Sequence, residues 1–584
     1  MSIPEYVERY NAWLRNEKVS ESDKEFLRTI SNNEDELKKR FSSYMSFGTA
    51  GLRSTMGPGT AMMNTYTVAH TTQAIAMLIL EENGADEGVA IAYDSRINSE
   101  IFAKTAASVL AANKIKVYIF DSIRPTPELS FALLHHGCIA GINITASHNP
   151  KEYNGYKVYW KDGAQLPVNH AETVTNKAAS IDIFDDVKTV DFNAAVKDGL
   201  INIIGAETDE AYLAEVEAQI VDKNAIKNVA DAFKVVYSPL HGTGYRLVPE
   251  ILSRVGVKHL YTVPEQMIID GNFPTVAKPN PEYPDTFAMA KELAIKNDCN
   301  LMIATDPDAD RIAATVRTND GEFVTFTGNQ MGLLLIDYII TAYEKNGSMP
   351  NAPFVVKSLV SSSLADKICK QHGIQIYNVL TGFKYIGEMI KLHDGKDGSY
   401  IFGFEESCGY LKGTYTRDKD AIVAAMLVCE MAAYHLAKGN TLYDALQNIY
   451  KKYGYSFERT EELAIDGIDA MEKQTKLMNF FRIINTPKFA HTYIQTVGDL
   501  LERKLIKQKD NSILPSPFPK SNVIIYYLEN GDQVIIRPSG TEPKIKFYYL
   551  ITATDSYEAL SRYAGYKARV ELLISDFYKY IHRY

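Results

Sequence analysis

Cysteine is scarce in this sequence and follows none of the spacings that bind metals or build disulfide scaffolds. The 584 residues contain five cysteines, an odd number, and no Cys-x-x-Cys pair. Disulfide-rich secreted domains and cysteine-based zinc sites depend on clustered cysteines. The sequence therefore argues against both, and it predicts a protein of a reducing compartment, the cytoplasm.

A long apolar run is missing as well. The most apolar helical stretch, residues 421–437, is interrupted by Glu430 and His435 and falls short of the ~20 residues that cross a bilayer. Residues 1–10 carry charges and lack the apolar core of a secretory signal. We therefore expect no export and no membrane partner, and residues 421–437 should form a buried core helix.

The sequence has no excess of basic charge. Lysine and arginine number 62 against 72 for aspartate and glutamate, so the net charge is −10. Because a negative protein repels polyanions, we expect no nucleic-acid partner, and an anionic small substrate would need a local basic pocket. The absence of GxSxG, GxxxxGK[ST] and GxGxxG motifs weakens hydrolase, nucleoside-triphosphatase and dinucleotide-binding interpretations.

What the sequence does have is length and a regular alternation of strands and helices. A chain of 584 residues corresponds to about four domains of ~150 residues each. Short β-branched runs alternate with helical stretches, which predicts an α/β class with parallel or mixed sheets. The expected strands are residues 89–93, 117–120, 139–145, 235–237, 301–305, 354–356 and 400–402.

Three segments open alike, with a strand, a polar turn and then a helix, which suggests three related α/β domains. They start at residues 89, 234 and 353, a spacing typical of whole domains. Before the first of them, residues 1–45 have the pattern of amphipathic helix.

The end of the chain follows a different pattern. Residues 507–520 contain three prolines and are expected to be a loop. Strands are expected at 523–528, 534–537 and 544–550, with an Asn-Gly hairpin turn between the first two. We therefore expect a small antiparallel α+β unit here.

The first candidate for chemistry is the segment Thr145-Ala146-Ser147-His148-Asn149-Pro150. It directly follows the apolar strand 139–144, and open α/β sheets place ligands at the carboxyl ends of strands. Ser147 is thus a candidate nucleophile. An ordinary turn is the alternative, because serine, asparagine and proline all favour turns.

The second candidate is Asp306-Pro307-Asp308-Ala309-Asp310-Arg311, after the expected strand 301–305. Three alternate carboxylates repel one another unless a divalent cation lies between them, and an all-oxygen site suits Mg²⁺. An EF-hand loop would need glycine and glutamate where Arg311 and Arg317 stand. A solvated acidic loop is the remaining alternative.

Further segments offer groups that could grip a substrate. Residues 403–409 (GFEESCG) present carboxylates and a hydroxyl suited to sugar hydroxyls, and residues 537–544 (RPSGTEPK) resemble a phosphate cradle. Residues 47–53, 381–384 and 417–419 add cationic groups amid small residues. Each segment alone could be a surface turn. Together with the serine and aspartate segments, however, they fall on four successive domains, which predicts a shared cleft.

Taken together and in this order, the TASHNP, DPDADR, GFEES and RPSGTEP segments resemble the α-D-phosphohexomutase family over residues 47–549. The resemblance implies a heart-shaped architecture of four domains, three of mixed α/β type and a C-terminal TBP-like α+β domain. The implied domains are 1–205 with the phosphoserine loop, 206–325 with the metal-binding loop, 326–455 with the sugar-binding loop and 456–584 with the phosphate-binding loop.

The resemblance also implies roles for single residues. Ser147 would be the phosphoserine, Lys157 the general acid or base, His148 its supporting partner, and Arg53 a neutralising group for the phosphoryl oxygens. The implied metal ligands for Mg²⁺ are Ser147, Asp306, Asp308 and Asp310. The implied substrate-binding residues are Arg311, Thr381, Gly382, Lys384, Glu405, Ser407, Lys419, Arg537, Ser539, Gly540 and Thr541.

The implied activity is that of an intramolecular phosphotransferase, which is an isomerase. The phosphoserine would phosphorylate a sugar phosphate, and the resulting bisphosphate would reorient and return its other phosphate. Residues 381–384 and 405–407 look like the glucomutase and phosphopentomutase branch. Glucose 1-phosphate and glucose 6-phosphate are therefore the expected substrates, with glucose 1,6-bisphosphate as priming activator. Two positions depart from the commonest family sequence: Ala309 stands where many members carry glycine, and Ser54 stands where glycine is frequent. Neither change removes a ligand, but both put the assignment to that branch in doubt.

Other activities stay open at this stage. A phosphopentomutase or a phosphomannomutase would use the same residues, and a metal-dependent phosphatase would share the first chemical step. A catalytically silent sugar-phosphate-binding protein would keep the fold, but such a protein needs no nucleophile, and Ser147 and Lys157 are both present. The expected assembly is a monomer or a homodimer.

Overall fold

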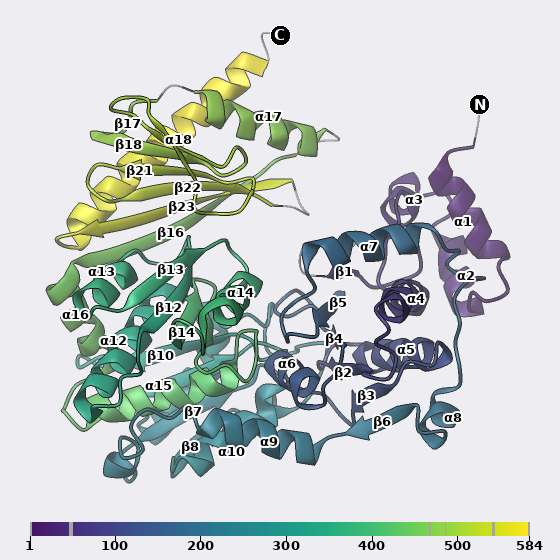
Figure 1. Ribbon diagram of the computed structural model, residues 1–584, viewed down its shortest axis with the longest axis horizontal. Coiled ribbons are helices and arrows are strands. Elements are labelled where there is room, and N and C mark those ends of the chain that lie inside the picture. The colour runs from purple at the N-terminus through teal and green to yellow at the C-terminus, as the bar shows by residue number, and fades with distance from the viewer. Residues whose placement is uncertain (1–2, 46–50, 467–468, 485, 540–542, 582–584) are drawn as a thin grey trace. The chain divides into compact units, whose positions relative to one another are not determined.

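The computed structural model describes residues 3–45, 51–466, 469–484, 486–539 and 543–581. The chain forms two compact units (Figure 1), named unit 1 and unit 2 below. Unit 1 contains Met1–Phe326 and Gly409–Thr441, and unit 2 contains Thr327–Cys408 and Leu442–Tyr584.

The N-terminal segment of unit 1 is helical, as its amphipathic pattern predicts. It folds into three short helices, α1 (Glu5–Arg15), α2 (Glu21–Thr29) and α3 (Glu34–Phe41). Side chains of Ser20 and Asn33 cap the second and third helices by accepting main-chain N–H groups. The apolar faces of the helices meet in a small cluster that includes Trp13.

The first sheet of unit 1 has the strand order β1-β5-β4-β2-β3-β6. The strands β4, β2, β3 and β6 are parallel, whereas β5 runs antiparallel to both β4 and β1. The predictions of strands at 89–93, 117–120 and 139–145 are confirmed. The strands are β1 (Leu52–Thr55), β2 (Val89–Tyr93), β3 (Val117–Phe120), β4 (Ala140–Ile144), β5 (Tyr153–Trp160) and β6 (Ile201–Ile204).

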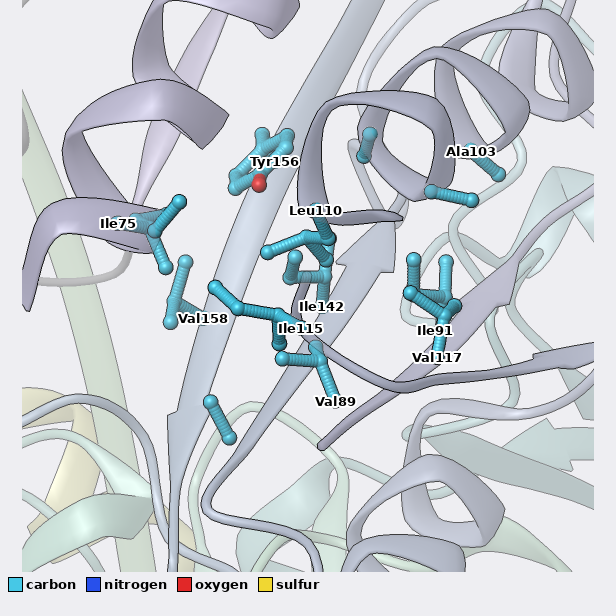
Figure 2. Close-up of a cluster of buried hydrophobic side chains, with 14 of the residues drawn as sticks. Ile75, Val89, Ile91, Ala103, Leu110, Ile115, Val117, Ile142, Tyr156 and Val158 are labelled. Atoms are coloured by element: carbon cyan, nitrogen blue, oxygen red, sulfur yellow. The ribbon is translucent and has the colours of Figure 1, made fainter. Parts of the chain in front are cut away.

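The two faces of this sheet have different neighbours. Helices α4 (Thr65–Glu81) and α5 (Ser99–Ala112) pack on one face, where Tyr156 and Val158 of β5 point into the apolar cluster drawn in Figure 2. Successive side chains of a strand alternate between faces. Lys157 therefore points to the opposite face, which is covered by α6 (Thr126–His135).

The second sheet of unit 1 has the order β11-β10-β9-β7-β8. Because β9 runs antiparallel to its neighbour β10, the short connection between them, which contains the three aspartates, turns back on itself. The predicted strands at 235–237 and 301–305 are confirmed. The strands are β7 (Lys234–Ser238), β8 (His259–Thr262), β9 (Leu301–Thr305), β10 (Ile312–Arg317) and β11 (Phe323–Thr325).

The helix α15 (Ala421–Leu436) contacts β9, β10 and α10 (Gly244–Arg254) within unit 1. Every residue from position 421 to 431 is buried, which confirms the predicted core helix. Among the described residues, no helix is long and apolar enough to cross a membrane.

Unit 2 begins with parallel strands, as predicted at 354–356 and 400–402. β12 (Pro353–Ser358) lies between β13 (Gln375–Val379) and β14 (Ser399–Glu405). The helices α12 (Gly328–Asn346) and α14 (Phe383–His393) contact this sheet.

The rest of unit 2 forms an antiparallel sheet of order β16-β23-β22-β21-β18-β19-β20, with β17 paired to β18. The helices α17 (Ala470–Ile483) and α18 (Ser556–Ile581) pack on it, so the predicted C-terminal α+β unit is confirmed. The strands are β16 (Tyr455–Ala464), β17 (Lys488–Phe489), β18 (Thr492–Asp499), β19 (Lys504–Lys507), β20 (Ile513–Pro515), β21 (Ile524–Leu528), β22 (Gln533–Pro538) and β23 (Lys544–Ala553).

The prediction of an uninterrupted loop over residues 507–520 is wrong. β19 and β20 pair as a hairpin at the edge of the sheet. The three residues of β20, Ile-Leu-Pro, are all apolar and all exposed. The strand therefore lacks the alternation of apolar and polar residues that would predict it. Main-chain pairing with β19 holds it in place, and its sequence carries no signal for that pairing.

Candidate active site

The predicted nucleophile lies where β4 ends and faces the aspartate segment that follows β9. Ser147 is 3% exposed. Its Oγ donates a hydrogen bond to Asp306 Oδ2 at 2.7 Å and lies 3.2 Å from His148 Nδ1. The backbone of Ser147 has a φ of 50°, a conformation that costs a non-glycine residue on the order of 1–3 kcal/mol. The turn is therefore held in place by its surroundings.

One of the groups that holds this turn is a buried arginine that the sequence patterns did not single out. Arg96 lies just after β2, and its guanidinium stands over the ring of Phe273 at 5.1 Å. It donates to four main-chain carbonyl oxygens at 2.5, 2.5, 2.9 and 3.0 Å, those of Ser147, Asn149, Pro150 and Tyr153. The available signal was its position at the carboxyl end of the strand beside β4.

Three buried carboxylates form the candidate metal site. Asp306, Asp308 and Asp310 each offer an oxygen, and these oxygens lie within 4.8 Å of one another. Among the described residues, Asp308 Oδ1 and Asp310 Oδ1 are buried without a hydrogen-bond partner. Buried carboxylate oxygens without donors are unfavourable, whereas Mg²⁺ prefers such oxygen ligands. The residues therefore fit a divalent cation.

Two lysines lie against these carboxylates. Lys157 Nζ is 2.7 Å from Asp308 Oδ2 and 3.4 Å from Asp310 Oδ2. Lys419 Nζ is 3.0 Å from both Asp310 Oδ2 and Asp418 Oδ1. The negative charge of the site is thus partly neutralised by groups of unit 1 itself.

Burial and neighbouring charges lower the pKa of Asp308 and raise the pKa values of Lys157 and Asp306. Burial disfavours the carboxylate of Asp308, but the ammonium of Lys157 together with the hydrogen bonds from Lys157 and Thr126 lowers the pKa of Asp308. Burial likewise disfavours the ammonium of Lys157, yet Asp308 and Asp310 raise the pKa of Lys157. Asp306 has no lysine partner among the residues that the structure describes, and burial and the other two carboxylates raise its pKa well above the ordinary range.

The three aspartates lie in the connection between β9 and β10, residues 306–311, which we call the aspartate loop. Its main chain is held by hydrogen bonds from three other segments of unit 1. Ala309 has a φ of 48°, a region where glycine is unstrained, which accounts for the preference for glycine at this position. Three consecutive carbonyl oxygens of the loop each accept a main-chain N–H group. Pro307 O accepts from Thr243 at 2.8 Å, Asp308 O from Thr126 at 2.9 Å, and Ala309 O from Ala421 at 3.1 Å.

Two arginines and a histidine border the site. Arg53 stands on β1, and its Nη1 donates to Asn149 Oδ1 at 3.0 Å. Arg311 Nη1 donates to Glu282 Oε1 at 2.9 Å. Burial, followed by the charges of the two arginines, lowers the pKa of His148 well below its ordinary value. The His148 ring is therefore neutral near pH 7.

Most of the predicted substrate-binding residues belong to unit 2. Gly382, with a φ of 122°, donates its N–H to Glu405 Oε1 at 2.6 Å. Thr381 Oγ1 is buried and has no hydrogen-bond partner in the described part of the chain. Lys384 Nζ lies 5.2 Å from the centre of the Tyr385 ring, and burial lowers the pKa of Lys384.

The predicted phosphate cradle lies at the end of β22 in the same unit. Burial raises the pKa of Tyr548, and the guanidinium of Arg537, hydrogen-bonded to it, opposes the shift. The same guanidinium also opposes the rise that burial causes in the pKa of Tyr385. Arg537 therefore lies near residues 381–385. Ser539 N–H donates to Lys544 O at 2.8 Å, and Ser407 is half-buried. Gly540 and Thr541 lie outside the described residues.

Comparison with known proteins agrees with this arrangement. Family models described as "Phosphoglucomutase/phosphomannomutase, alpha/beta/alpha" domains I, II and III match residues 44–183, 210–321 and 327–453. A relative named "Phosphoglucomutase" from Staphylococcus saprophyticus is 38% identical over 540 residues, which cover 92% of this chain and 95% of the relative. The chain belongs to the phosphoglucomutase/phosphomannomutase family.

Solved structures of family members share the fold at lower identity. The open form of pp63/parafusin (phosphoglucomutase) from Paramecium superposes with a TM-score of 0.66 at 16% identity, over 93% of this chain and 96% of that chain. An Aspergillus fumigatus N-acetylphosphoglucosamine mutase in complex with GlcNAc-6P and magnesium gives 0.51 at 14% identity, over 99% and 100%. The expected architecture, three α/β domains followed by a sheet-rich C-terminal domain, is confirmed.

As a member of the phosphoglucomutase/phosphomannomutase family, the chain is an isomerase that transfers phosphoryl groups. Unit 1 brings together all the predicted catalytic residues and metal ligands. Two residues predicted to bind substrate, Arg311 and Lys419, also lie in unit 1, at the aspartate loop. The other predicted substrate-binding residues belong to unit 2.

Proposed function

We propose that the chain is a phosphoglucomutase, which interconverts glucose 1-phosphate and glucose 6-phosphate through phosphorylated Ser147. One observation carries the proposal: the Ser147 hydroxyl lies 2.7 Å from an oxygen of the buried aspartate triad. A nucleophile in direct contact with a candidate Mg²⁺ site is suited to phosphoryl transfer. The name of the staphylococcal relative supports glucose phosphates as substrates.

In the proposed reaction, the bond between Ser147 Oγ and phosphorus breaks while a sugar hydroxyl oxygen bonds to the same phosphorus. The hydroxyl loses a proton, and Ser147 Oγ gains one. We assign this proton exchange to Lys157, which lies among the aspartates at 2.7 Å from Asp308 Oδ2, with neutral His148 beside Ser147. The bisphosphate then reorients, and its other phosphate returns to the serine.

The charges of the site suit this transfer. Mg²⁺, when bound by Asp306, Asp308 and Asp310, supplies positive charge to the phosphoryl oxygens. The magnesium in the A. fumigatus relative supports this cofactor, and its GlcNAc-6P supports a sugar-phosphate substrate. Arg53 and Arg311 add cationic groups beside the serine loop, where charge spreads over the transferring oxygens.

Substrate recognition is assigned to both units. In this proposal Glu405 and Ser407 of unit 2 bind sugar hydroxyls, residues 381–384 of unit 2 are further substrate-binding residues, and Lys419 is the substrate-binding lysine of unit 1. The non-reacting phosphate binds the 537–541 segment, namely Arg537, Ser539, Gly540 and Thr541. Glucose 1,6-bisphosphate is the proposed priming activator, because it can phosphorylate the serine directly.

The domain division 1–205, 206–325, 326–455 and 456–584 is part of the proposal. The family ranges 44–183, 210–321 and 327–453 support its first three parts. A cytoplasmic location and a monomeric or dimeric state stay predictions.

The test compares kcat/KM for the 1-phosphates of glucose, mannose and ribose, with Mg²⁺ and a trace of glucose 1,6-bisphosphate. A clear preference for glucose supports the proposal. A preference for ribose or mannose reassigns the substrate to phosphopentomutase or phosphomannomutase with the same residues in the same roles. Release of free phosphate without isomerised sugar indicates a phosphatase, and no turnover of any substrate indicates a silent binding protein.

A further inference from the structure

A buried hydroxyl reaches the candidate metal site from the helix that covers the β4–β5 face. Thr126 is the first residue of α6, and it is 0% exposed. Its Oγ1 lies 2.7 Å from Asp308 Oδ2, although the two residues are 182 positions apart in the sequence. Asn143 of β4, also 0% exposed, has its Nδ2 at 2.7 Å from the same Oγ1.

The direction of these hydrogen bonds follows from what each group can donate. The carboxylate of Asp308 is paired with the Lys157 ammonium and can only accept. A threonine hydroxyl has one proton, so Thr126 must give it to Asp308 and must accept from its other neighbour. The Asn143 amide is a suitable donor and thereby fixes the hydroxyl in that orientation.

The two oxygens of Asp308 therefore have different surroundings. Oδ2 accepts from Thr126 and from Lys157, both at 2.7 Å. Oδ1 is buried and has no hydrogen-bond partner in the described part of the chain. The terminal torsion of an aspartate is soft, so contacts at Oδ2 decide where Oδ1 points.

We propose that Thr126 is a positioning residue that anchors Asp308 Oδ2 and thereby presents Oδ1 to a divalent cation. The inference rests on the metal role proposed above for the aspartate triad. Groups behind a metal ligand commonly orient it in this way, and their loss typically weakens metal affinity about 10–100-fold.

The other two groups that hold the aspartate loop make an internal comparison. Thr243 and Ala421 contact the loop through main-chain N–H groups, as Thr126 also does. The Thr243 hydroxyl is buried without a hydrogen-bond partner among the described residues, and alanine has no hydroxyl. Among these three residues, Thr126 alone adds a side-chain contact to a carboxylate.

The experiment measures the dissociation constant for Mg²⁺ by calorimetric titration of MgCl₂ into the full chain. Thr126→Val keeps the shape of the side chain and removes the hydroxyl, whereas Thr126→Ser keeps the hydroxyl. We expect the valine variant to bind Mg²⁺ about 10–100-fold more weakly and the serine variant to stay within about threefold of the unchanged protein. Equal affinity of all three proteins overturns the inference.

Thr243→Val is the matched control, because it removes a buried hydroxyl from another residue that contacts the aspartate loop, and that hydroxyl touches no carboxylate. Its Mg²⁺ affinity should be unchanged, and a loss equal to that of Thr126→Val would also overturn the inference. Thermal unfolding without Mg²⁺ checks the fold of each variant. Thr126→Ala replaces the valine variant if valine does not fold.

Turnover separates this inference from the proposed function. In Thr126→Val, kcat at low Mg²⁺ should fall while KM for the sugar phosphate stays within about twofold, and raising Mg²⁺ should restore kcat. A loss that Mg²⁺ does not restore indicates a merely structural role. If Thr126→Val binds Mg²⁺ normally in an active mutase, the positioning role fails and the proposed function stands; if the unchanged protein binds no Mg²⁺, both fail.

Discussion

The two units contain candidate functional residues of different character. In unit 1 the serine, the lysine and the aspartates assigned to chemistry are almost fully buried, with Ser147 at 3%, Lys157 at 5% and Asp306 at 0% exposure, whereas Arg53 at their border is exposed. In unit 2 most of the side chains assigned to recognition, among them Lys384 and Arg537, are half-buried, and Glu405 is buried. Transfer of a phosphoryl group needs fixed reacting atoms, whereas binding a ligand needs surface that the ligand can reach.

The largest expected effect tests whether the buried serine is the nucleophile. Ser147→Ala removes the oxygen that carries the phosphoryl group, so kcat should fall by roughly 10⁴-fold or more. Circular dichroism should show an unchanged fold. Ser180→Ala is the matched control: Ser180 is exposed, and within the described part of the chain its hydroxyl bonds only to Lys177 O. Near-normal turnover of Ser147→Ala contradicts the assignment.

The second prediction concerns the arginine that holds the serine turn. Arg96→Lys keeps the charge but cannot reach four carbonyl oxygens in the same geometry, so the turn should shift and kcat should fall roughly 100-fold. Phe273→Leu removes only the ring under the guanidinium and should lower kcat less than tenfold. If the two variants lose equal activity, the hydrogen bonds to the turn are not the decisive contacts.

The third prediction moves to unit 2 and should give a different kinetic signature. Arg537→Ala removes a charged contact to the non-reacting phosphate, so KM should rise roughly 10–100-fold while kcat changes only a few-fold. Arg459→Ala, at an arginine side chain that is 61% exposed, is the control. A large loss of kcat with an unchanged KM would contradict the assignment of substrate binding to unit 2 and of chemistry to unit 1.

The smallest effect on activity is expected at a buried acid of unit 1 that has no proposed role in the reaction. Burial raises the pKa of Glu128 to about 8, and neither oxygen has a hydrogen-bond partner among the described residues. Between its ordinary pKa and about 8 the folded state holds a proton that the unfolded state has lost. The free energy of unfolding therefore falls by about 1.4 kcal/mol per pH unit in this range because of this group.

Glu128→Gln removes that titration. The variant should resemble the unchanged protein near pH 5 and be more stable at pH 8 to 9, with kcat unchanged at pH 7. Thermal unfolding followed across this pH range provides the measurement. Parallel stability curves for the two proteins would show that Glu128 is ionised in the fold.

Local patterns predict much of this fold, and contacts between distant segments account for most of what they miss. The strands at 89–93 and 301–305 are confirmed because a continuous apolar run is a local signal. Ser147 and the aspartates follow such runs, so their meeting at strand ends could be anticipated. Thr126 could not, because its contact depends on how α6 packs against a loop 182 residues further along the chain.

The family resemblance supplied what geometry alone would not, namely the roles of Lys157 and of residues in unit 2. Local patterns failed at the hairpin of β19 and β20, where three exposed residues pair through their main chain. They also missed Arg96, since an arginine after a strand has no distinctive spacing. Its importance follows from the parallel pairing of β2 with β4.

The return of the chain to unit 1 through Gly409–Thr441 sets an order of events during protein synthesis. α15 packs on β9 and β10, and its first residue donates to Ala309 O in the aspartate loop. Although residues 306–310 leave the ribosome early, their loop cannot reach its final form until about residue 441 has been made. The growing chain therefore carries an uncovered apolar sheet face through this interval, when nascent chains are most prone to aggregate and to bind chaperones.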